Sequence, residues 1–259
     1  MRAALAQLRP EPRDVGANVA RVRESLARCE AVDLLLLPEL FLSGYELADP
    51  EAVSVALDGP EVEDMREAAR ESGSALIVGA AERVDYGVAN SAICINRLGE
   101  LAGVYRKTHL FGAEADVFVD GRELVTLELD GRRLGLMICF DVEFPEVART
   151  LALRGADLLV TISANPSVFR RDHDVFVAAR ALENGLPHLY VNRVGKQHGF
   201  VFAGSSMAID PEGRVLALAG PEDEDLLVTD VGEAGRRDER TRYLDLVRPS
   251  LYDAPPEPD

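Results

Sequence analysis

The sequence predicts a layered α/β fold, with helices on the outside and sheets inside. Apolar runs of strand length alternate along the chain with segments whose apolar residues recur at helical spacing. The order β-α-β-α-β-β occurs in both halves, and strands and helices interleaved in this way are typical of sheets covered by helices. The chain has 259 residues, of which 47% are hydrophobic, so one large domain fits better than two small ones.

The first half of the chain contains the first set of these elements. We expect a strand over residues 2–8 and a helix over residues 18–30, whose apolar side chains share one face. Residues 33–37 are a continuous aliphatic run, typical of a strand covered on both faces, which Pro38 ends because proline has no N–H to donate. A helix at 61–71, ended by Gly73, precedes strands at 75–84 and 89–96 and a return strand towards Tyr105.

The second half repeats this pattern. The expected elements are a hairpin of 125–129 and 134–139, a helix at 146–154, a strand at 157–163, a helix at 172–184, a strand at 187–192 and a hairpin of 206–210 with 215–219. From Gly232 onward the chain is charged and rich in proline. We therefore expect residues 232–259 to be either a frayed end or an arm that contacts a partner subunit.

Composition excludes several classes of protein. The formal net charge is -17, which would repel phosphate backbones and anionic membrane surfaces, so we expect no nucleic-acid or membrane partner. The start of the chain has no basic segment followed by a long apolar one, and no run approaches the ~18 apolar residues of a membrane helix. The three cysteines are far apart and form no CxxC pair, which favours a reducing compartment over disulfides or zinc. We expect a soluble, cytoplasmic protein.

Three polar side chains occur where apolar strands end: Glu39, Lys107 and Cys139. Because ligands bind at strand ends in open α/β sheets, these side chains are expected to meet in one pocket. A carboxylate can accept the thiol proton, an ammonium lowers the thiol pKa and stabilises an oxyanion, and a thiolate attacks a carbonyl or nitrile carbon. The N–H of Phe140, directly after the cysteine, is a candidate for a second oxyanion donor.

Each of these residues also has a plain structural interpretation. A cysteine in an apolar run is usually a small packing residue, as we expect of Cys29 on a helix face and Cys94 in mid-strand. Lysine is more informative, because only Lys107 and Lys196 among the 28 basic residues are lysine. GC-rich codon usage explains most of that bias, but an ammonium also fits a crowded reaction centre better than a guanidinium does.

Three ordered motifs surround these residues. They are Leu37-Pro38-Glu39-Leu40-Phe41 with Ser43-Gly44-Tyr45, Tyr105-Arg106-Lys107-Thr108-His109-Leu110-Phe111, and Ile138-Cys139-Phe140-Asp141 with Phe144-Pro145-Glu146. With these motifs the sequence resembles the nitrilase superfamily of carbon-nitrogen hydrolases over nearly its whole length. The resemblance implies a four-layer α-β-β-α sandwich, a single domain over residues 1–259, and assembly into a homodimer or a higher homo-oligomer.

The resemblance also implies roles for individual residues. Glu39 would be the general base, Lys107 the oxyanion stabiliser and Cys139 the nucleophile. A second carboxylate, which orients the lysine, is matched by Glu114, although spacing alone does not choose Glu114 over Asp116. The expected oxyanion and substrate site is completed by Phe140, Glu143, Tyr45 and Asn165. No cofactor and no metal are expected.

The branch of the superfamily follows from the residues after the cysteine. Nitrilases usually have Trp-Glu there, whereas Phe140 to Pro145 of this chain looks more like the amidases. Members that act on omega-amides of dicarboxylates tend to carry arginine where Glu143 stands, and an acid there should repel a carboxylate-bearing substrate. We therefore expect a neutral or cationic amide, unless Glu143 is held in a structural ion pair. Gln197 also replaces an acidic residue that is common in many members.

The expected reaction is hydrolysis of a primary amide to an acid and ammonia through a cysteine thioester. The alternatives are hydrolysis of an N-carbamoyl compound or a nitrile, acyl transfer to an amine, and a catalytically silent binding or scaffold protein. A serine hydrolase is disfavoured because Gly204-Ser205-Ser206 lacks the Gly-x-Ser-x-Gly frame. Among the histidines, His109 lies nearest to the lysine in sequence, and we expect it to have a structural hydrogen-bonding role.

Overall fold

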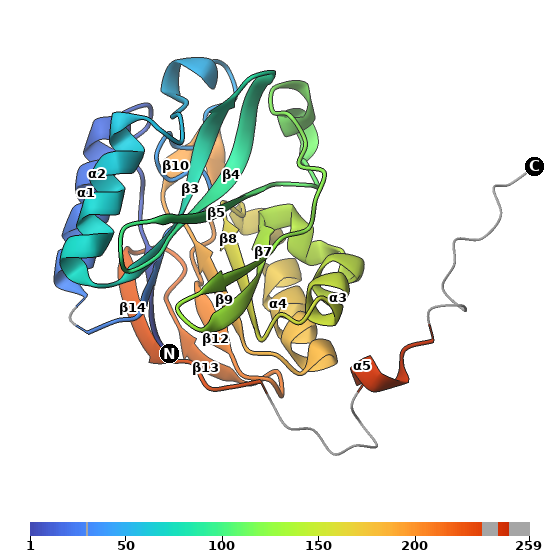
Figure 1. The fold of residues 1–259 in the computed structure, drawn as a ribbon. Coiled ribbons are helices and arrows are strands. Elements are labelled where there is room, and N and C mark those ends of the chain that lie inside the picture. Colours follow the sequence, from blue (N-terminus) through green and yellow to red (C-terminus); the bar gives the residue numbers. More distant parts are fainter. Residues whose placement is uncertain (30, 235–242, 249–259) are drawn as a thin grey trace, which may run out of the picture.

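Two six-stranded sheets form the centre of the molecule. The computed structural model describes residues 1–29, 31–234 and 243–248 of the chain. Its first half contains, in order, β1 (Arg2–Gln7), α1 (Val15–Arg28), β2 (Leu34–Leu36), α2 (Pro60–Ser72), β3 (Ala75–Val84), β4 (Gly87–Ile95) and β5 (Leu101–Arg106). The first three of these strands are parallel, and β4 and β5 follow as an antiparallel meander (Figure 1).

The second half has the same order of elements. It contains β6 (Thr126–Leu129), β7 (Arg132–Ile138), α3 (Pro145–Leu153), β8 (Leu158–Ser163), α4 (Arg170–Asn184), β9 (His188–Asn192), β12 (Met207–Ile209) and β13 (Val215–Leu218). Here β7, β8 and β9 are parallel, and β12 and β13 follow antiparallel. The last strand, β14 (Asp225–Asp230), returns to the first sheet and pairs with β1. The sheet orders are therefore β14-β1-β2-β3-β4-β5 and β13-β12-β9-β8-β7-β6.

Short elements connect these parts. They are η1 (Glu51–Val53), η2 (Gly112–Asp116), η3 (Cys139–Glu143), η4 (Ser167–Phe169), β10 (Lys196–Gln197), β11 (Phe200–Val201) and α5 (Tyr243–Leu246). The helix ends follow their sequence signals. Asp14 accepts a hydrogen bond from Ala17 N–H at the start of α1, and Gly73 ends α2 in the left-handed region, at φ 68°.

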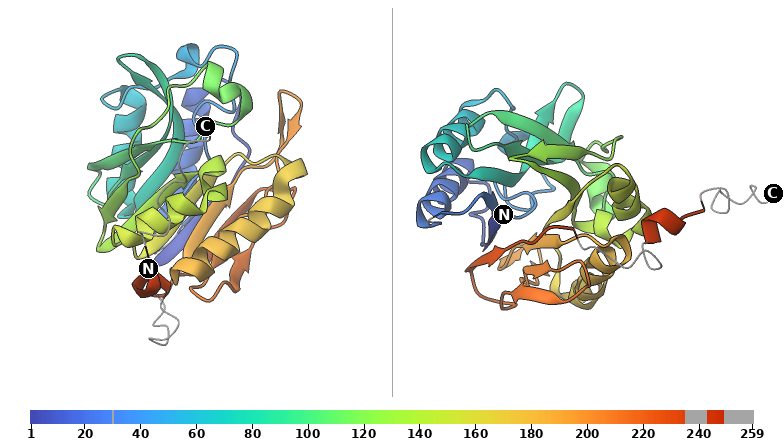
Figure 2. Two further views of the ribbon diagram at one scale, coloured as in Figure 1. Left: turned by 90° about the vertical axis from the view of Figure 1, so that its right-hand side faces the viewer. Right: turned by 60° about the horizontal axis from the view of Figure 1, so that its bottom comes forward.

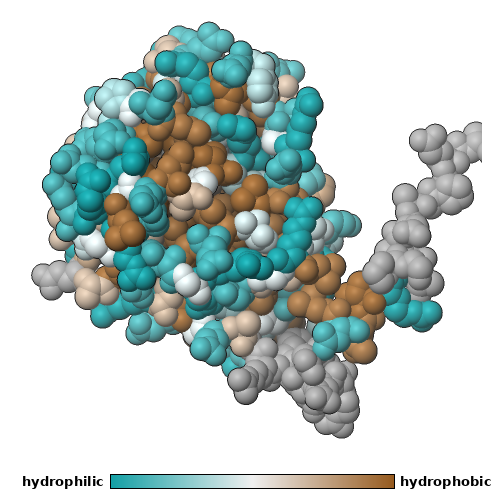
Figure 3. All heavy atoms as spheres, viewed as in Figure 1, coloured by the Kyte–Doolittle hydropathy of each residue, from teal (hydrophilic) through white to brown (hydrophobic). Residues whose placement is uncertain are grey.

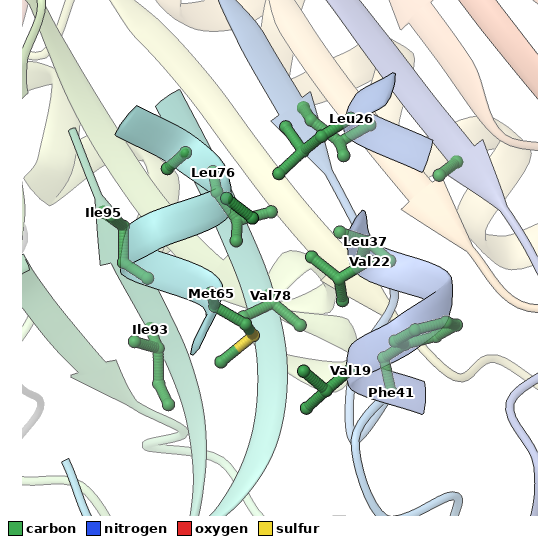
Figure 4. Packing of buried hydrophobic residues seen from close by; sticks show 14 of the residues in the cluster. Val19, Val22, Leu26, Leu37, Phe41, Met65, Leu76, Val78, Ile93 and Ile95 are labelled. Carbon is green, nitrogen blue, oxygen red and sulfur yellow. The ribbon is translucent and has the colours of Figure 1, made fainter. Parts of the chain in front are cut away.

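Alternation along the strands produces the four layers. Successive strand side chains point to opposite faces, so Leu34 and Leu36 of β2 pack between the sheets while Leu35 packs towards the helices. The helix pair α1 and α2 covers the first sheet, and α3 and α4 cover the second (Figure 2). Figure 4 shows the outer packing on the first sheet, where Val19, Val22 and Leu26 of α1 and Met65 of α2 lie against Leu76 and Val78 of β3.

The predicted α-β-β-α sandwich with two repeats is confirmed. Predicted element bounds agree with the structure to within about three residues, apart from the edges of the sheets. The prediction missed β14, an edge strand whose residues are all exposed or half-buried. Of the predicted arm at 232–259, residues 235–242 and 249–259 lie outside the described part. No helix in the described ranges is long and apolar enough to cross a membrane.

Candidate active site

The three predicted site residues stand directly after strands. Glu39 follows β2, Lys107 follows β5, and Cys139 begins η3 at the end of β7. All three side chains are buried. The turn that carries Glu39 lies against Gly79 of β3, where a Cβ atom would come within 2.2 Å of the carbonyl oxygen of Pro38. Only glycine allows this close approach, so the sequence of β3 helps to place the carboxylate.

The Glu39 carboxylate accepts three hydrogen bonds. Asn90 Nδ2 and Lys107 Nζ donate to Oε1 at 2.7 and 2.6 Å, and Ala164 N–H donates to Oε2 at 2.7 Å. These donors come from β4, from the end of β5 and from the loop after β8, so both sheets fix the carboxylate. Burial raises the pKa of Glu39, and the ammonium of Lys107 opposes that shift.

Lys107 lies between two carboxylates. Its Nζ is 2.6 Å from Glu39 Oε1 and 2.8 Å from Glu114 Oε2. Burial alone would lower the pKa of Lys107, but the two carboxylates outweigh it and hold the pKa well above its ordinary value, so the side chain stays an ammonium. Tyr45 Oη donates to Glu114 Oε1 at 2.7 Å, and Phe111 N–H donates to Oε2 at 3.0 Å. Of the two acidic residues between which spacing alone did not choose, Glu114 and Asp116, Glu114 is the one that contacts Lys107.

Cys139 sits on a tight turn with a left-handed backbone, at φ 46°. Such a conformation is strained for a residue with a side chain, and the surrounding contacts must hold it. Asp141 supplies them: its carboxylate accepts hydrogen bonds from Ile138 N–H at 2.9 Å, Tyr105 Oη at 2.7 Å and Thr108 Oγ1 at 2.9 Å. Through these contacts one buried carboxylate ties the turn that carries the thiol to the loop after β5.

His109 belongs to the same anchor. Its Nδ1 lies 2.9 Å from Asp141 Oδ1, and its ring stacks on Phe144 with 4.0 Å between the ring centroids. These contacts agree with the structural role expected for His109.

Burial raises the pKa of the Cys139 thiol, and the charge of Glu39 adds to that effect. Lys107 acts in the predicted direction, since it lowers this pKa, but it does not outweigh burial. The surroundings of Cys139 therefore favour the thiol over the thiolate. Cys94 shows the effect of burial on its own, which raises the pKa of this thiol to about 12.

A small pocket opens beside the sulfur. It is lined by Tyr45, Phe111, Glu114, Cys139, Phe140, Glu143, Ala164, Asn165, Pro166, Phe169 and His173. All of the predicted site residues except Glu39 and Lys107 therefore line one cavity, and those two lie behind Glu114. Asn165 Nδ2 donates to Phe169 O at 3.3 Å, and the Phe140 N–H is in the first turn of η3, where N–H groups have no partner within the helix.

Glu143 has a neighbour that sequence reasoning missed. Its Oε1 lies 3.4 Å from Nε2 of His173, a buried residue of α4 that also lines the pocket. Asn90 and Asp141 were missed as well. Asn90 carries no sequence signal beyond a polar residue in an apolar strand, while Asp141 lay inside the cysteine motif without an assigned role. Within the described ranges, no group of three or more His, Cys, Asp and Glu side chains is arranged to hold a metal ion.

Gln197 is the neutral partner of a buried cation. Arg193 Nη1 donates to Gln197 Oε1 at 2.9 Å, and its guanidinium lies 4.0 Å from the centroid of the Phe202 ring. Its Nε and Nη2 have no hydrogen-bond partner in the described part of the chain. Gln197 Oε1 also accepts from Tyr45 N–H at 3.0 Å, so this amide connects the arginine to the pocket wall.

Comparison with known proteins places this geometry in a family. The family model described as "Carbon-nitrogen hydrolase" matches residues 2–238. The chain belongs to the carbon-nitrogen hydrolase family. This carbon-nitrogen hydrolase is 39% identical over 259 residues to a Pseudomonas protegens protein named "Hydrolase in pqqF 5'region", with 98% of this chain and 91% of that protein covered. It is 37% identical over 245 residues to an (R)-stereoselective amidase from Pseudomonas sp., with 92% and 89% covered.

Solved structures agree. A structure of a mutant amidase from Nesterenkonia sp. AN1, with the acetamide moiety of fluoroacetamide covalently added at the active-site cysteine, matches this carbon-nitrogen hydrolase with a TM-score of 0.87. The two are 32% identical, and the match covers 97% of this chain and 95% of the other. A mutant of the same amidase in complex with butyramide matches with a TM-score of 0.86. The predicted placement in the amidase-like branch of the nitrilase superfamily is confirmed.

Proposed function

We propose that this protein hydrolyses a primary amide to a carboxylic acid and ammonia, through a thioester on Cys139. One observation carries the proposal. The thiol lies at the end of a strand, in a pocket shared with Glu114, and Glu114 holds the ammonium that also binds the buried carboxylate of Glu39. One mutant of the similar Nesterenkonia amidase carries the acetamide moiety of fluoroacetamide on its active-site cysteine, and another binds butyramide, which supports the same use of this pocket.

In the first half-reaction Glu39 accepts the thiol proton as the sulfur of Cys139 attacks the amide carbon. The raised pKa of Glu39 brings its proton affinity closer to that of the thiol, which favours this transfer. Negative charge then develops on the carbonyl oxygen, where Lys107 Nζ and the Phe140 N–H are the available donors. Protonated Glu39 returns its proton to the nitrogen, ammonia leaves, and the acyl group remains on the sulfur as a thioester.

The second half-reaction reverses the proton transfers. Glu39 takes a proton from water, the resulting hydroxide attacks the thioester carbon, and the same donors stabilise the second oxyanion. The tetrahedral intermediate collapses to release the acid, and the thiolate recovers its proton from Glu39. Glu114 keeps the ammonium in place throughout, because it is itself fixed by Tyr45 Oη and Phe111 N–H.

The pocket wall favours an uncharged acyl group. Three phenylalanines and Pro166 line it, and no arginine is among its lining residues in the described part of the chain. A carboxylate on the substrate would therefore lose water without gaining a cation, and Glu143 would repel it. The cavity measures only about 10 Å³, close to the space of one water molecule, so an amide enters only when lining side chains such as Phe169 move.

Ammonia release from a panel of substrates tests the proposal. The panel contains neutral, anionic and cationic primary amides, nitriles and N-carbamoyl compounds, and we expect turnover with neutral amides. Cys139→Ala should abolish turnover, while Cys94→Ala, which removes a buried thiol that does not line the pocket, should leave it near the wild-type value. Hydroxylamine in the assay would trap the thioester as a hydroxamate. Near-wild-type activity of Cys139→Ala would show that the nucleophile is wrongly assigned.

The oligomeric state and the cellular location of the protein are proposals. We infer a homodimer built on α3 and α5, because a groove of about 750 Å³ between them carries exposed Leu153 and Leu246, and Figure 3 shows apolar atoms gathered at α5. A second copy of this chain is the proposed occupant, and Leu153→Glu should convert the dimer to a monomer in light scattering. A single domain over 1–259 and a cytoplasmic location remain expectations from the sequence.

A further inference from the structure

A second chain of buried polar side chains leads from Cys139 to the wall of the pocket. It consists of Ser163 at the end of β8, Tyr190 on β9, His173 on α4 and Glu143 on η3. The proposed mechanism uses none of the first three. Ser163, Tyr190 and His173 are each at most 2% exposed, so their polar atoms depend on one another rather than on water.

The register of the sheet places the first link. Strands β7 and β8 are parallel with Ile138 beside Ile162, so the next residues, Cys139 and Ser163, leave the two strands side by side. The Ser163 hydroxyl acts to lower the pKa of the Cys139 thiol, which is the effect expected of a donor beside the sulfur.

The next two links are hydrogen bonds between side chains. Tyr190 Oη donates to Ser163 Oγ at 3.2 Å, and Tyr190 Oη lies 2.8 Å from Nδ1 of His173. The other ring nitrogen of His173, Nε2, faces Glu143 Oε1 at 3.4 Å. Glu143 is partly exposed at the pocket, so the chain begins at the substrate side and ends on the nucleophile.

The bond from Tyr190 to Ser163 determines which atom donates between Tyr190 and His173. If Tyr190 gives its only hydrogen to Ser163, its oxygen must accept one from Nδ1 of His173. Nε2 faces the carboxylate of Glu143 at 3.4 Å. The two ring nitrogens of His173 therefore connect the pocket carboxylate to the Tyr190 hydroxyl.

We propose that His173 is a positioning residue that stabilises the thiolate of Cys139 through Tyr190 and Ser163, with Glu143 in contact with Nε2 of its ring. The inference deepens the proposed function and rests on it for the role of the thiolate. When Glu39 takes the thiol proton, the Ser163 hydroxyl already points at the sulfur, so no reorganisation is needed as charge develops.

Glu143 contacts His173, so through the network it influences the Cys139 thiol as well as the charge that the substrate can carry. This contact bears on the alternative that the sequence left open, in which Glu143 is held in a structural pair. The network is only one influence on the pKa of the Cys139 thiol, because the charges of Glu39, Lys107 and Glu114 also act on the sulfur. Around His173 the facing ionisable groups are Glu143 and Tyr190.

Alkylation of the thiol tests the network without any amide substrate. The rate of Cys139 modification by iodoacetamide is measured against pH in the full chain, and peptide mass spectrometry identifies the modified cysteine. Tyr190→Phe removes one hydroxyl and keeps the ring, so we expect the midpoint of the profile to rise by about one pH unit. His173→Gln should shift it in the same direction. With the best amide, Tyr190→Phe should lower kcat about tenfold and change KM less than about twofold.

His188→Gln is the matched control. His188 is also fully buried on β9, and it bonds to Thr161 Oγ1 at 2.8 Å and to Val177 O at 3.1 Å, outside the chain that reaches the thiol. This variant should lose stability while its alkylation midpoint stays at the wild-type value.

The possible outcomes separate the hypotheses. Tyr190→Phe with an unchanged midpoint overturns the proposal, even if kcat falls, because packing alone would then explain the loss. A change confined to KM in Glu143→Gln would make the pair a substrate contact and also overturn it. Wild-type protein that hydrolyses no amide, together with a shifted midpoint in Tyr190→Phe, would refute the proposed function and leave the network standing. If His173→Gln does not fold, the alkylation midpoint of Tyr190→Phe alone tests the proposal.

Discussion

Removing the ammonium of Lys107 is the sharpest test of how the site is held together. Its Nζ lies 2.6 Å from Glu39 and 2.8 Å from Glu114, and all three side chains are buried. Lys107→Met keeps most of the side-chain volume but leaves the two carboxylates without their cation. One change therefore removes the proposed oxyanion donor and leaves the repulsion between two buried carboxylates without a compensating charge.

The size of the effect follows from these contacts. Breaking a buried ion pair by removing one partner costs about 3–5 kcal/mol of stability, and this lysine serves two carboxylates, so we expect a value at the upper end. Loss of one oxyanion donor lowers kcat by about 10²–10³ on its own. Without the opposing charge of Lys107 the pKa of Glu39 rises further, so a larger share of Glu39 is already protonated at neutral pH and cannot accept the thiol proton.

The loss of stability in Lys107→Met should depend on pH. A carboxyl group whose folded pKa lies above its unfolded value stabilises the fold below the unfolded pKa, and this contribution disappears as the pH rises through the folded pKa. Because the variant raises the pKa of Glu39, the difference between wild type and Lys107→Met should narrow as the pH falls from about 8 to about 5.

Urea unfolding at several pH values measures the loss of stability in Lys107→Met, and kcat on the best amide measures its loss of activity. Lys196→Met is the matched control, since it removes the only other lysine, an exposed residue of β10, and should change neither quantity. Lys107→Arg keeps the charge but brings a wider fork, and we expect it to recover less than about a tenth of the activity. Wild-type stability of Lys107→Met at pH 8 would refute this account of the site.

Three further predictions use other contacts. Gly79→Ala, whose Cβ would meet Pro38 O at 2.2 Å, should displace the turn before the general base, costing about 3 kcal/mol in thermal unfolding and at least about tenfold in kcat/KM. Gln197→Glu gives the buried cation of Arg193 an anionic partner and should raise stability by about 1–3 kcal/mol; an unchanged melting temperature would contradict this. Since burial raises the pKa of Glu39, kcat/KM should fall on the acid side at a pH above the ordinary value of about 4.3, and an acid limb at or below that value would count against Glu39 as the base.

The layers of the fold could be predicted because their signals are local. The aliphatic run before Pro38 and the similar run before Ser163 both form central parallel strands, where burial on both faces requires apolar residues throughout. The edge strand β14 was missed because one of its sides has no partner strand. Its residues then need not alternate strictly, and its place beside β1 depends on a contact with a strand more than 200 residues away.

The site could be predicted only where a strand end and a motif coincide. Glu39, Lys107 and Cys139 satisfy both conditions, whereas the residues that hold them do not. Asp141 acts by accepting hydrogen bonds from two segments about 30 residues apart, and His173 reaches the site only through the packing of α4 on β9. Such partners are set by register and helix orientation, which a single sequence does not encode locally.

The repeated architecture explains why the reacting groups meet. The carboxylate of Glu39 follows the second parallel strand of one sheet, and the pocket residue Asn165 follows the second parallel strand of the other. Ala164 N–H, just before Asn165, donates directly to Glu39, so the two loops touch where the sheets pack. The acid and base groups and the thiol therefore come from different halves of the chain, and a shift of one sheet against the other would separate the base from the nucleophile while leaving each half intact.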